Sequence, residues 1–285
     1  MTFTTRFAPS PTGPLHLGHA FSALLAHDMA RAAGGAFLLR IEDIDSTRSR
    51  QKWEDQIYDD LTWLGITWDA PPLRQSDRLP AYRDALQTLW DRDLLYPCTC
   101  TRRDIAASAS APQEGDALVY GPDGLIYPGT CRGSHSSGTP LPQDTALRLD
   151  MAAALKGYKH LGFDEAGDGC EQPRFHLDPD DLINGVGDIV LSRRDFLGSY
   201  HLSVVLDDAM QGITHVVRGQ DLFEATAIHV VLQRLLGLPT PVYHHHRLIR
   251  DEAGKRLAKR DDARAISKFR SEGASPKEIR QMVGL

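Results

Sequence analysis

The order of apolar segments in the first 41 residues constrains the fold of this chain more than any other feature. Their spacing predicts a strand at Thr5–Ala8, a helix over Leu15–Ala33 and a second strand at Ala36–Ile41. A strand, a helix and a strand in this order form a right-handed βαβ unit, in which the two strands are parallel. The chain is therefore predicted to be an α/β protein built on a parallel sheet.

A proline-rich loop joins the first strand to the helix, and it carries two histidines. Residues 8–19 read APSPTGPLHLGH, which brings His16 and His19 to the positively polarised end of the helix. Gly18 has no Cβ, so a ligand can approach the backbone there. Such groups can stabilise charge on a phosphoryl group. A histidine pair can also simply cap a helix, so the residues alone leave two interpretations.

Length, composition and charge limit the class of protein. A chain of 285 residues with 41% hydrophobic and 25% charged residues is long enough for one large domain or for one domain with an insertion. It has no apolar run of membrane length and no signal-peptide pattern, and four cysteines suit a reducing compartment, so we expect a cytoplasmic protein. The net charge of −6 argues against broad, non-specific nucleic-acid binding, although local basic patches can still contact RNA.

The local composition and apolar pattern of the sequence predict four segments. Residues 1–97 form the first half of a nucleotide-binding domain, and residues 188–250 form the second half. Between them, residues 98–187 are dense in Gly, Pro, Ser and Asp, which predicts an inserted subdomain. Residues 251–285 hold a basic loop and a short helical tail.

Individual elements are predicted within these segments. Helical spacing of apolar residues covers Trp53–Leu64 and Tyr82–Leu89, and a further apolar helix covers Ala225–Leu236. Strands are predicted at Ser203–Leu206 and Ile213–Val217 because both are short and rich in β-branched residues. The polar stretch Ala106–Gln113 is predicted to be a loop.

Three cysteines in the predicted insertion have the spacing of a metal site. Cys98 and Cys100 are too close in sequence to bridge each other easily, but both can face one metal ion, and Cys131 adds a third thiolate. Zinc usually takes four ligands, and a set of unlinked buried thiols is an equally good explanation of the spacing. Cys170 falls outside this group and has no predicted role.

Two stretches resemble the signatures of class I aminoacyl-tRNA synthetases. The run Arg6–His19 resembles their HIGH signature, with a lead-in similar to that of the glutamyl and glutaminyl branch. Far downstream, Gly254–Arg260 resembles the KMSKS loop, although Ala258 stands where the family usually has serine. The resemblance implies a Rossmann-type catalytic domain that transfers adenylate. The residues that it implies for ATP binding and catalysis are His16, Gly18, His19, Arg256 and Lys259.

The segment Arg40–Arg48 is similar to the glutamyl form of the family rather than the glutaminyl form. Alternation along the preceding strand predicts that Arg40 and Glu42 share one face. The resemblance implies that glutamate is bound by Arg6, Ser10, Glu42, Tyr200 and Arg218. An arginine fork suits the glutamate side-chain carboxylate, and Glu42 matches the residue that contacts the α-amino group.

The glutamyl members of the family carry a zinc ion in the insertion, so the resemblance also bears on the cysteines. Truncated relatives bind it with Cys, Cys, Tyr and Cys, which correspond here to Cys98, Cys100, Tyr127 and Cys131. Tyrosine is an unusual ligand, and His135 is a spare candidate. The resemblance therefore implies one structural zinc ion.

Only residues 261–285 follow the basic loop, and we expect no anticodon-binding domain. In this respect the whole chain is similar to the glutamyl-Q tRNA(Asp) synthetases. That family activates L-glutamate with ATP, with Mg²⁺ expected, and transfers it to the queuosine base in the anticodon of tRNA(Asp). The alternatives are a short glutamyl-tRNA synthetase that charges the tRNA 3′ end, and a non-catalytic tRNA-binding regulator. Retention of His16, His19 and Lys259 argues against the regulator.

Overall fold

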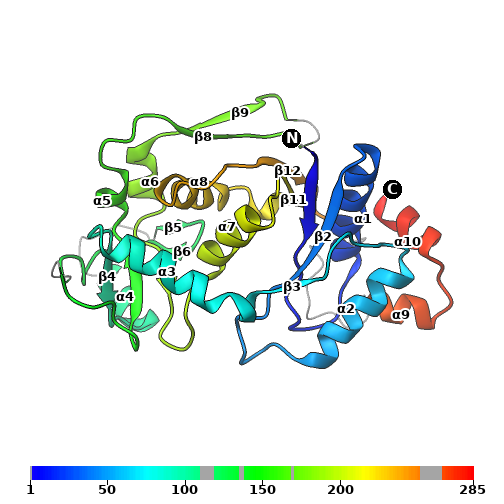
Figure 1. Ribbon diagram of the computed structural model, residues 1–285, viewed down its shortest axis with the longest axis horizontal. Helices are drawn as coiled ribbons and strands as arrows, with labels where there is room; N and C mark the ends of the chain where they lie inside the picture. The colour runs from blue at the N-terminus through cyan, green and yellow to red at the C-terminus, as the bar shows by residue number, and fades with distance from the viewer. Residues whose placement is uncertain (1, 110–118, 135–137, 168–169, 251–264) are drawn as a thin grey trace.

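The computed structural model describes residues 2–109, 119–134, 138–167, 170–250 and 265–285 (Figure 1). Parallel strands form the centre of the molecule in two groups. The first group, in the order β1-β2-β3, consists of β1 (Thr4–Phe7), β2 (Ala36–Ile41) and β3 (Leu73–Arg74). The second group consists of β11 (His215–Gly219) and β12 (Val242–His246). The Thr214 N–H donates to the Thr4 carbonyl at 2.9 Å, so β11 lies beside β1.

Helices from both ends of the chain pack together on one side of these strands. They are α1 (Leu17–Ala32), α2 (Gln51–Trp63), α9 (Ile266–Ser271) and α10 (Pro276–Val283). Figure 1 shows α10 beside α1, and the two helices are in contact. Their apolar faces share one core, in which Leu24, Phe37 and Ile279 are fully buried. Burial of this face stabilises α10, which is too short to be stable alone.

A second core joins the remaining helices of the catalytic half to the predicted insertion. It contains α3 (Leu79–Trp90), which follows the 3₁₀ turn η1 (Gln75–Arg78), and α7 (Tyr200–Met210). It also contains α8 (Thr226–Leu235), which follows the 3₁₀ turn η2 (Gln220–Leu222). Within the described ranges, no helix is both long and apolar enough to span a bilayer.

The predicted insertion lies at the end of the molecule opposite α10 (Figure 1). Its strand β7 (Ala146–Leu149) is the middle of an antiparallel sheet in the order β10-β7-β4, whose outer strands are β4 (Leu95–Cys98) and β10 (Val190–Ser192). The sheet therefore extends beyond the predicted bounds of 98–187 at both ends. Two hairpins accompany it, β5 (Tyr120–Gly121) with β6 (Gly124–Leu125), and β8 (Leu161–Asp164) with β9 (Arg174–Leu177). Its helices are α4 (Arg102–Ala109), α5 (Met151–Leu155) and α6 (Pro179–Gly185).

The predicted βαβ unit is confirmed, with Thr5 opposite Phe37 in a parallel register. Two local predictions are wrong. The stretch Ser203–Leu206 is helical within α7, because Ser199 caps the helix and the apolar residues pack into the core instead of a sheet. Part of Ala106–Gln113 belongs to α4, which a reciprocal pair of hydrogen bonds between Thr101 and Asp104 begins. Residues 110–113 lie outside the described ranges.

Candidate functional site

A cavity of about 260 Å³ opens where the parallel strands end, as expected for an open α/β sheet. Eight of the residues predicted to bind substrates line it, and they come from β1 and the loop after it, the residue after β2, β11, and the N-terminal ends of α1 and α7. They are Arg6, Ser10, His16, Gly18, His19, Glu42, Tyr200 and Arg218. The other two predicted residues, Arg256 and Lys259, lie outside the described residues.

The two histidines of the proline-rich loop cap α1. The Gly18 N–H donates to His16 Nδ1 at 3.1 Å, and the His16 N–H donates to His19 Nδ1 at 3.1 Å. An Nδ1 atom that accepts a hydrogen bond leaves the proton of a neutral imidazole on Nε2. The two histidines therefore do cap the helix, and in the neutral form the same bonds leave Nε2 of each ring as the donor nitrogen.

Gly18 has a second role that the sequence argument missed. A Cβ atom at this position would lie 3.0 Å from Cε1 of His16, closer than ordinary contacts allow. Glycine at this position therefore leaves room for the His16 ring to fold back over the helix terminus, and a larger residue would require the ring to shift. The predicted benefit to an approaching ligand comes in addition to this.

The residues that the structure describes just before and just after the predicted KMSKS-like loop lie at or beside the cavity. Ile249 lines the cavity before the loop. After the loop, Ala265 forms a β-bridge with His16, and the Ile266 N–H donates to the Leu15 carbonyl at 2.9 Å. The HIGH-like segment is thus joined by backbone pairing to Ala265 and Ile266, which follow the predicted KMSKS-like loop in the sequence.

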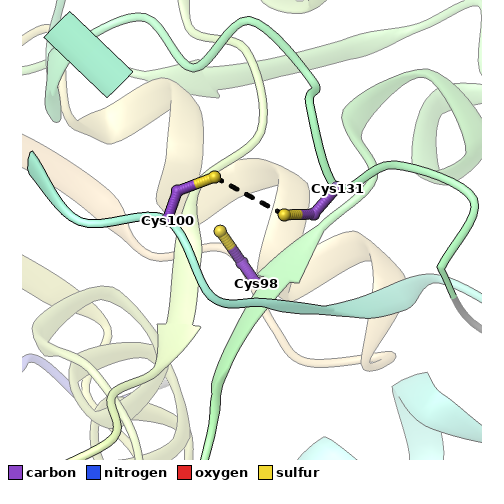
Figure 2. Close-up of side chains that lie close together, drawn as sticks. All are labelled: Cys98, Cys100 and Cys131. Atoms are coloured by element: carbon purple, nitrogen blue, oxygen red, sulfur yellow. Dashed lines mark hydrogen bonds between the residues drawn. The ribbon is translucent and has the colours of Figure 1, made fainter. Parts of the chain in front are cut away.

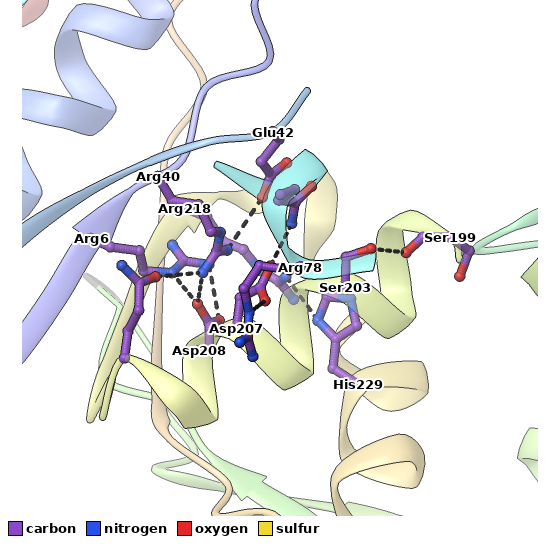
Figure 3. Close-up of polar contacts among 12 residues, drawn as sticks. Arg6, Arg40, Glu42, Arg78, Ser199, Ser203, Asp207, Asp208, Arg218 and His229 are labelled. Atoms are coloured by element: carbon purple, nitrogen blue, oxygen red, sulfur yellow. Dashed lines mark hydrogen bonds and ion pairs between the residues drawn. The ribbon is translucent and has the colours of Figure 1, made fainter. Parts of the chain in front are cut away.

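Buried charges hold the floor of the cavity in place (Figure 3). Arg6 binds Asp208 through two hydrogen bonds of 2.9 and 3.2 Å. Arg40 reaches the same carboxylate at 2.6 Å and also reaches Glu42 at 3.2 Å, so Arg40 and Glu42 do share a face. Asp208 is a functional residue that was not predicted from the sequence. The acidic pair Asp207-Asp208 in an otherwise apolar stretch was the available signal.

The pKa values in this network follow from burial and charge. Burial works to raise the pKa of Asp208, but Arg6 and Arg40 outweigh it, and the pKa lies below its usual value. At Glu42 burial dominates over Arg40 and Arg6, and the pKa is raised. A cation that binds beside Glu42 would favour its ionised form, so the site is suited to an ammonium group.

Arg218 is 5% exposed and is held on several sides. Its guanidinium donates to Nε2 of His245 at 3.1 Å, Nδ1 of His229 at 3.1 Å, Oγ1 of Thr226 at 2.8 Å and the carbonyl of Leu222 at 3.1 Å. Because Arg218 also lines the cavity, it places a fixed positive charge beside it, which suits a carboxylate ligand.

The predicted metal ligands converge in the insertion. The Sγ atoms of Cys98, Cys100 and Cys131 all lie within 4.8 Å of one another (Figure 2). The Tyr127 hydroxyl lies 3.5 Å from Cys98 Sγ and 3.4 Å from Cys100 Sγ. Hydrogen bonding with Tyr127 is the main cause that lowers the Cys131 pKa to about 7. The donor set therefore fits a thiolate-rich ion such as zinc. His135 lies outside the described residues.

A buried arginine and aspartate join this cluster to the sheet of the insertion. Arg148 donates to Cys98 Sγ at 3.3 Å and stacks over the Tyr127 ring at 3.9 Å. It also donates to the Asp188 carbonyl at 2.8 Å, while the Asp188 carboxylate accepts hydrogen bonds from Tyr96 and Arg132. The cluster is thus attached to β4, β7 and the segment before β10.

Comparison with known proteins gives one consistent family. The model for tRNA synthetases class I (E and Q), catalytic domain, matches residues 2–117 and 174–285. A Rhodobacter capsulatus protein named glutamyl-Q tRNA(Asp) synthetase is 67% identical over 285 residues, which cover 99% of each chain. A Rhodopirellula baltica protein of the same name is 42% identical, with 96% of this chain and 82% of the relative covered.

Solved structures agree with this result. A glutamate-tRNA synthetase from Elizabethkingia anophelis superposes with a TM-score of 0.78 at 27% identity. A glutamate tRNA ligase from Elizabethkingia meningosepticum, in complex with its amino acid, gives a TM-score of 0.76 at the same identity. Each match covers 100% of this chain and 61% of the solved one, so the chain spans about three-fifths of their length.

Proposed function

The chain belongs to the class I tRNA synthetases of the glutamate and glutamine branch, and on this premise we propose that it is a glutamyl-Q tRNA(Asp) synthetase. It is a ligase that activates L-glutamate with ATP and transfers the glutamyl group to the queuosine base in the anticodon of tRNA(Asp). The observation that carries this proposal is the identity of 67%, over 99% of both chains, to a protein of that name. The cavity at the strand ends supports it, because its lining suits both substrates.

Glutamate recognition is assigned to the residues on the sheet side of the cavity. Arg6 and Arg218 bind the side-chain carboxylate, and Glu42 binds the α-amino group. Tyr200 and Ser10 line the rest of the glutamate site. The fixed bonds of Arg6 to Asp208 support this assignment, because a guanidinium held in place loses little freedom when the ligand binds.

Activation needs positioning and charge stabilisation, with no side-chain nucleophile. An oxygen of the glutamate α-carboxylate attacks the α-phosphorus of ATP, and the bond to pyrophosphate breaks to give glutamyl-adenylate. His16 and His19 donate to the phosphates, and Gly18 lets them approach the helix terminus. Lys259 and Arg256 neutralise the departing pyrophosphate, and Mg²⁺ accompanies the ATP phosphates, as in the family.

Transfer requires space for a nucleoside beside the adenylate. A second cavity of about 480 Å³ shares Ser10, Glu42 and Tyr200 with the first and extends to Asp123 of the insertion. A hydroxyl of the queuosine ring attacks the glutamyl carbonyl from this side to form an ester, AMP leaves with the bonding electrons, and the hydroxyl proton is released to solvent. Asp123 lies in the β5–β6 turn, so the insertion faces the acceptor.

The Cys98, Cys100, Tyr127 and Cys131 cluster is proposed to hold one structural zinc ion. The convergence of three thiols and a phenol supports this assignment, because these oxygen and sulfur atoms lie close together around one point. When bound, zinc supplies a cross-link that stabilises the insertion. We also propose the four-segment division of the chain and a cytoplasmic location, where ATP, glutamate and tRNA are present.

The test is glutamate-dependent ATP–pyrophosphate exchange without tRNA, followed by transfer of labelled glutamate to tRNA(Asp). We expect exchange without tRNA, and transfer only when the tRNA carries queuosine. Periodate oxidation of the 3′-terminal ribose, with the queuosine diol protected, should leave transfer intact. Charging of unmodified tRNA(Glu) at its 3′ end would instead indicate a short glutamyl-tRNA synthetase, and no exchange at all would indicate a regulator.

Lys259→Ala should abolish most of the exchange, because it removes a charge that neutralises the departing pyrophosphate.

A further inference from the structure

A continuous series of hydrogen bonds crosses the protein through Arg218, and the proposed chemistry does not use most of its members. On one side, Arg218 Nε donates to Nε2 of His245, whose Nδ1 lies 2.5 Å from Oε2 of Glu165. On the other side, Arg218 Nη1 donates to Nδ1 of His229, whose Nε2 lies 3.2 Å from Nδ1 of His201. Nε2 of His201 lies 3.2 Å from Oδ1 of Asp123.

The direction of each hydrogen bond follows from Arg218, because a guanidinium has only donors. His245 must accept at Nε2, so its proton is on Nδ1 and points to Glu165. His229 must accept at Nδ1, so its Nε2 proton points to His201. His201 then accepts at Nδ1 and donates from Nε2 to Asp123. His229 and His245 are therefore neutral rings, and each tautomer in the series is determined by its neighbours.

The surroundings favour these neutral rings. His229 and His245 are 1% and 4% exposed, and burial lowers the pKa of both imidazoles, assisted by the charge of Arg218. A protonated ring would present an N–H to the guanidinium, and two donors would face each other at about 3 Å.

Both terminal carboxylates belong to the predicted insertion, whereas Arg218 lies in β11 of the catalytic half. Glu165 follows β8, and its Oε1 accepts from the N–H groups of His245 at 2.9 Å and of Gly167 at 2.7 Å. Glu165 is therefore fixed in orientation, with Oε2 directed to the His245 ring. Asp123, in the β5–β6 turn, has a side chain that is 39% exposed and lines the second cavity.

We propose that Glu165 and Asp123 are positioning residues for glutamate recognition, acting through His245 and through His201 and His229. Each carboxylate fixes a histidine tautomer that accepts from Arg218, and the two histidines hold the guanidinium toward the cavity. The insertion thus orients the arginine that binds the amino acid. This inference rests on the proposed function for the identity of the substrate, but the tautomers do not depend on it.

Glu165→Gln tests the proposal sharply, because glutamine has nearly the same shape. Its Oε1 keeps the two backbone N–H partners, so its Nε2 amide must face Nδ1 of His245. The His245 proton then moves to Nε2 and opposes the Arg218 Nε–H. We expect KM for glutamate in pyrophosphate exchange to rise about tenfold, with KM for ATP unchanged. Asp164→Asn is the matched control, since Asp164 is exposed and pairs only with Arg174 across the hairpin in the described chain.

Two variants of Asp123 test the other end of the hydrogen-bond series independently. Asp123→Ala removes the acceptor for His201, and we expect KM for glutamate to rise by about threefold. Asp123→Asn retains an oxygen acceptor and should restore a KM close to that of the unmodified protein. A role of Asp123 in surface charge alone would make both variants behave alike, and that outcome would overturn the proposal at this end.

Nitrogen-15 NMR of the histidine side chains provides a readout that does not require activity. The unmodified protein should show His245 as the Nδ1–H tautomer and His229 as the Nε2–H tautomer, with assignments from His245→Gln and His229→Gln. Glu165→Gln should convert His245 to the Nε2–H tautomer. If Glu165→Gln leaves both the tautomer and KM for glutamate unchanged, the proposal is wrong. If the unmodified protein lacks exchange but shows these tautomers, the proposed function fails and the positioning network stands.

Discussion

The arginine pocket at the strand ends and the cysteine cluster of the insertion satisfy their polar groups in different ways. In the pocket, Arg6, Arg40 and Arg218 are each bound by partners from other segments of the same chain. In the cluster, the thiols of Cys98, Cys100 and Cys131 mainly face one another and the Tyr127 hydroxyl. In the first region protein groups supply the counter-charges and acceptors, whereas in the second we propose that an ion supplies the positive charge.

This difference shows how the two regions depend on their surroundings. A buried charge costs several kcal/mol unless a counter-charge accompanies it, so the pocket depends on the correct folding of distant segments. In the proposed zinc site, converging thiolates repel one another until a cation binds, so we expect the cluster to depend on metal supply and on pH. Changes to the two regions should therefore have separable consequences.

The largest expected effect comes from removal of the cluster. Cys98→Ser with Cys100→Ser should reduce zinc from about one ion per chain to none and should destabilise the insertion by at least about 5 kcal/mol. Metal analysis and limited proteolysis measure the two effects. Cys170→Ser is the matched control, because Cys170 lies outside the cluster and bonds the Gln172 carbonyl. A metal-free unmodified protein with full stability would contradict the zinc assignment.

A smaller effect is expected when the pocket loses its central carboxylate. Asp208→Asn leaves Arg6 and Arg40 without their shared counter-charge, which should lower the free energy of unfolding by about 3–5 kcal/mol. Urea denaturation measures this change. Zinc content should stay the same, and Asp195→Asn, at an exposed ion pair with Arg193, should change stability by less than about 1 kcal/mol. Loss of zinc from Asp208→Asn would show that the two regions are coupled.

The effect that is smallest for each unit of pH is the response of the pocket to acid. Burial lowers the pKa of His229 and His245 in the folded protein, while both titrate near 6.5 when unfolded. Protonation therefore favours the unfolded state. Stability should be full above about pH 6.5 and should fall below it by up to about 1.4 kcal/mol per pH unit for each histidine. Urea denaturation between pH 5 and 8 checks the sign.

Acid should also release the metal, because thiolates take up protons. The same pH series in the Cys98→Ser, Cys100→Ser background separates the two causes. The slope that persists there belongs to the histidines and other groups outside the cluster. If the slope vanishes in that background, the acid response belongs to the cluster alone.

The features that sequence analysis predicted depend mainly on local pattern. The βαβ unit follows from nearest-neighbour spacing, and Glu42 shares a face with Arg40 because strands alternate. The eight predicted lining residues meet because strand ends in a parallel sheet converge on one edge. The Cys98 to Cys131 grouping was likewise visible in the spacing, although spacing could not distinguish a metal site from separate thiols.

The features that sequence analysis missed depend on contacts between distant segments. Asp208 lies 202 residues from Arg6, and Glu165 lies 80 residues from His245, so no local period relates them. The β-branched run in α7 was predicted as a strand, because local propensity favours one, and tertiary packing decided otherwise. Gly18 was assigned to ligand approach because the position of the His16 ring was unknown.

The junction of β11 with β1 has a consequence for the order in which the molecule assembles. Thr4 and Thr214 are 210 residues apart, and closing a loop of that length costs roughly 5 kcal/mol of chain entropy. Contacts between residues so far apart in the sequence form slowly, so the arginine pocket should be among the last parts of the protein to form during folding. An amino-terminal piece of the chain would carry the HIGH-like segment but no pocket. Substrates that bind only the completed site would then stabilise the entire sheet against unfolding.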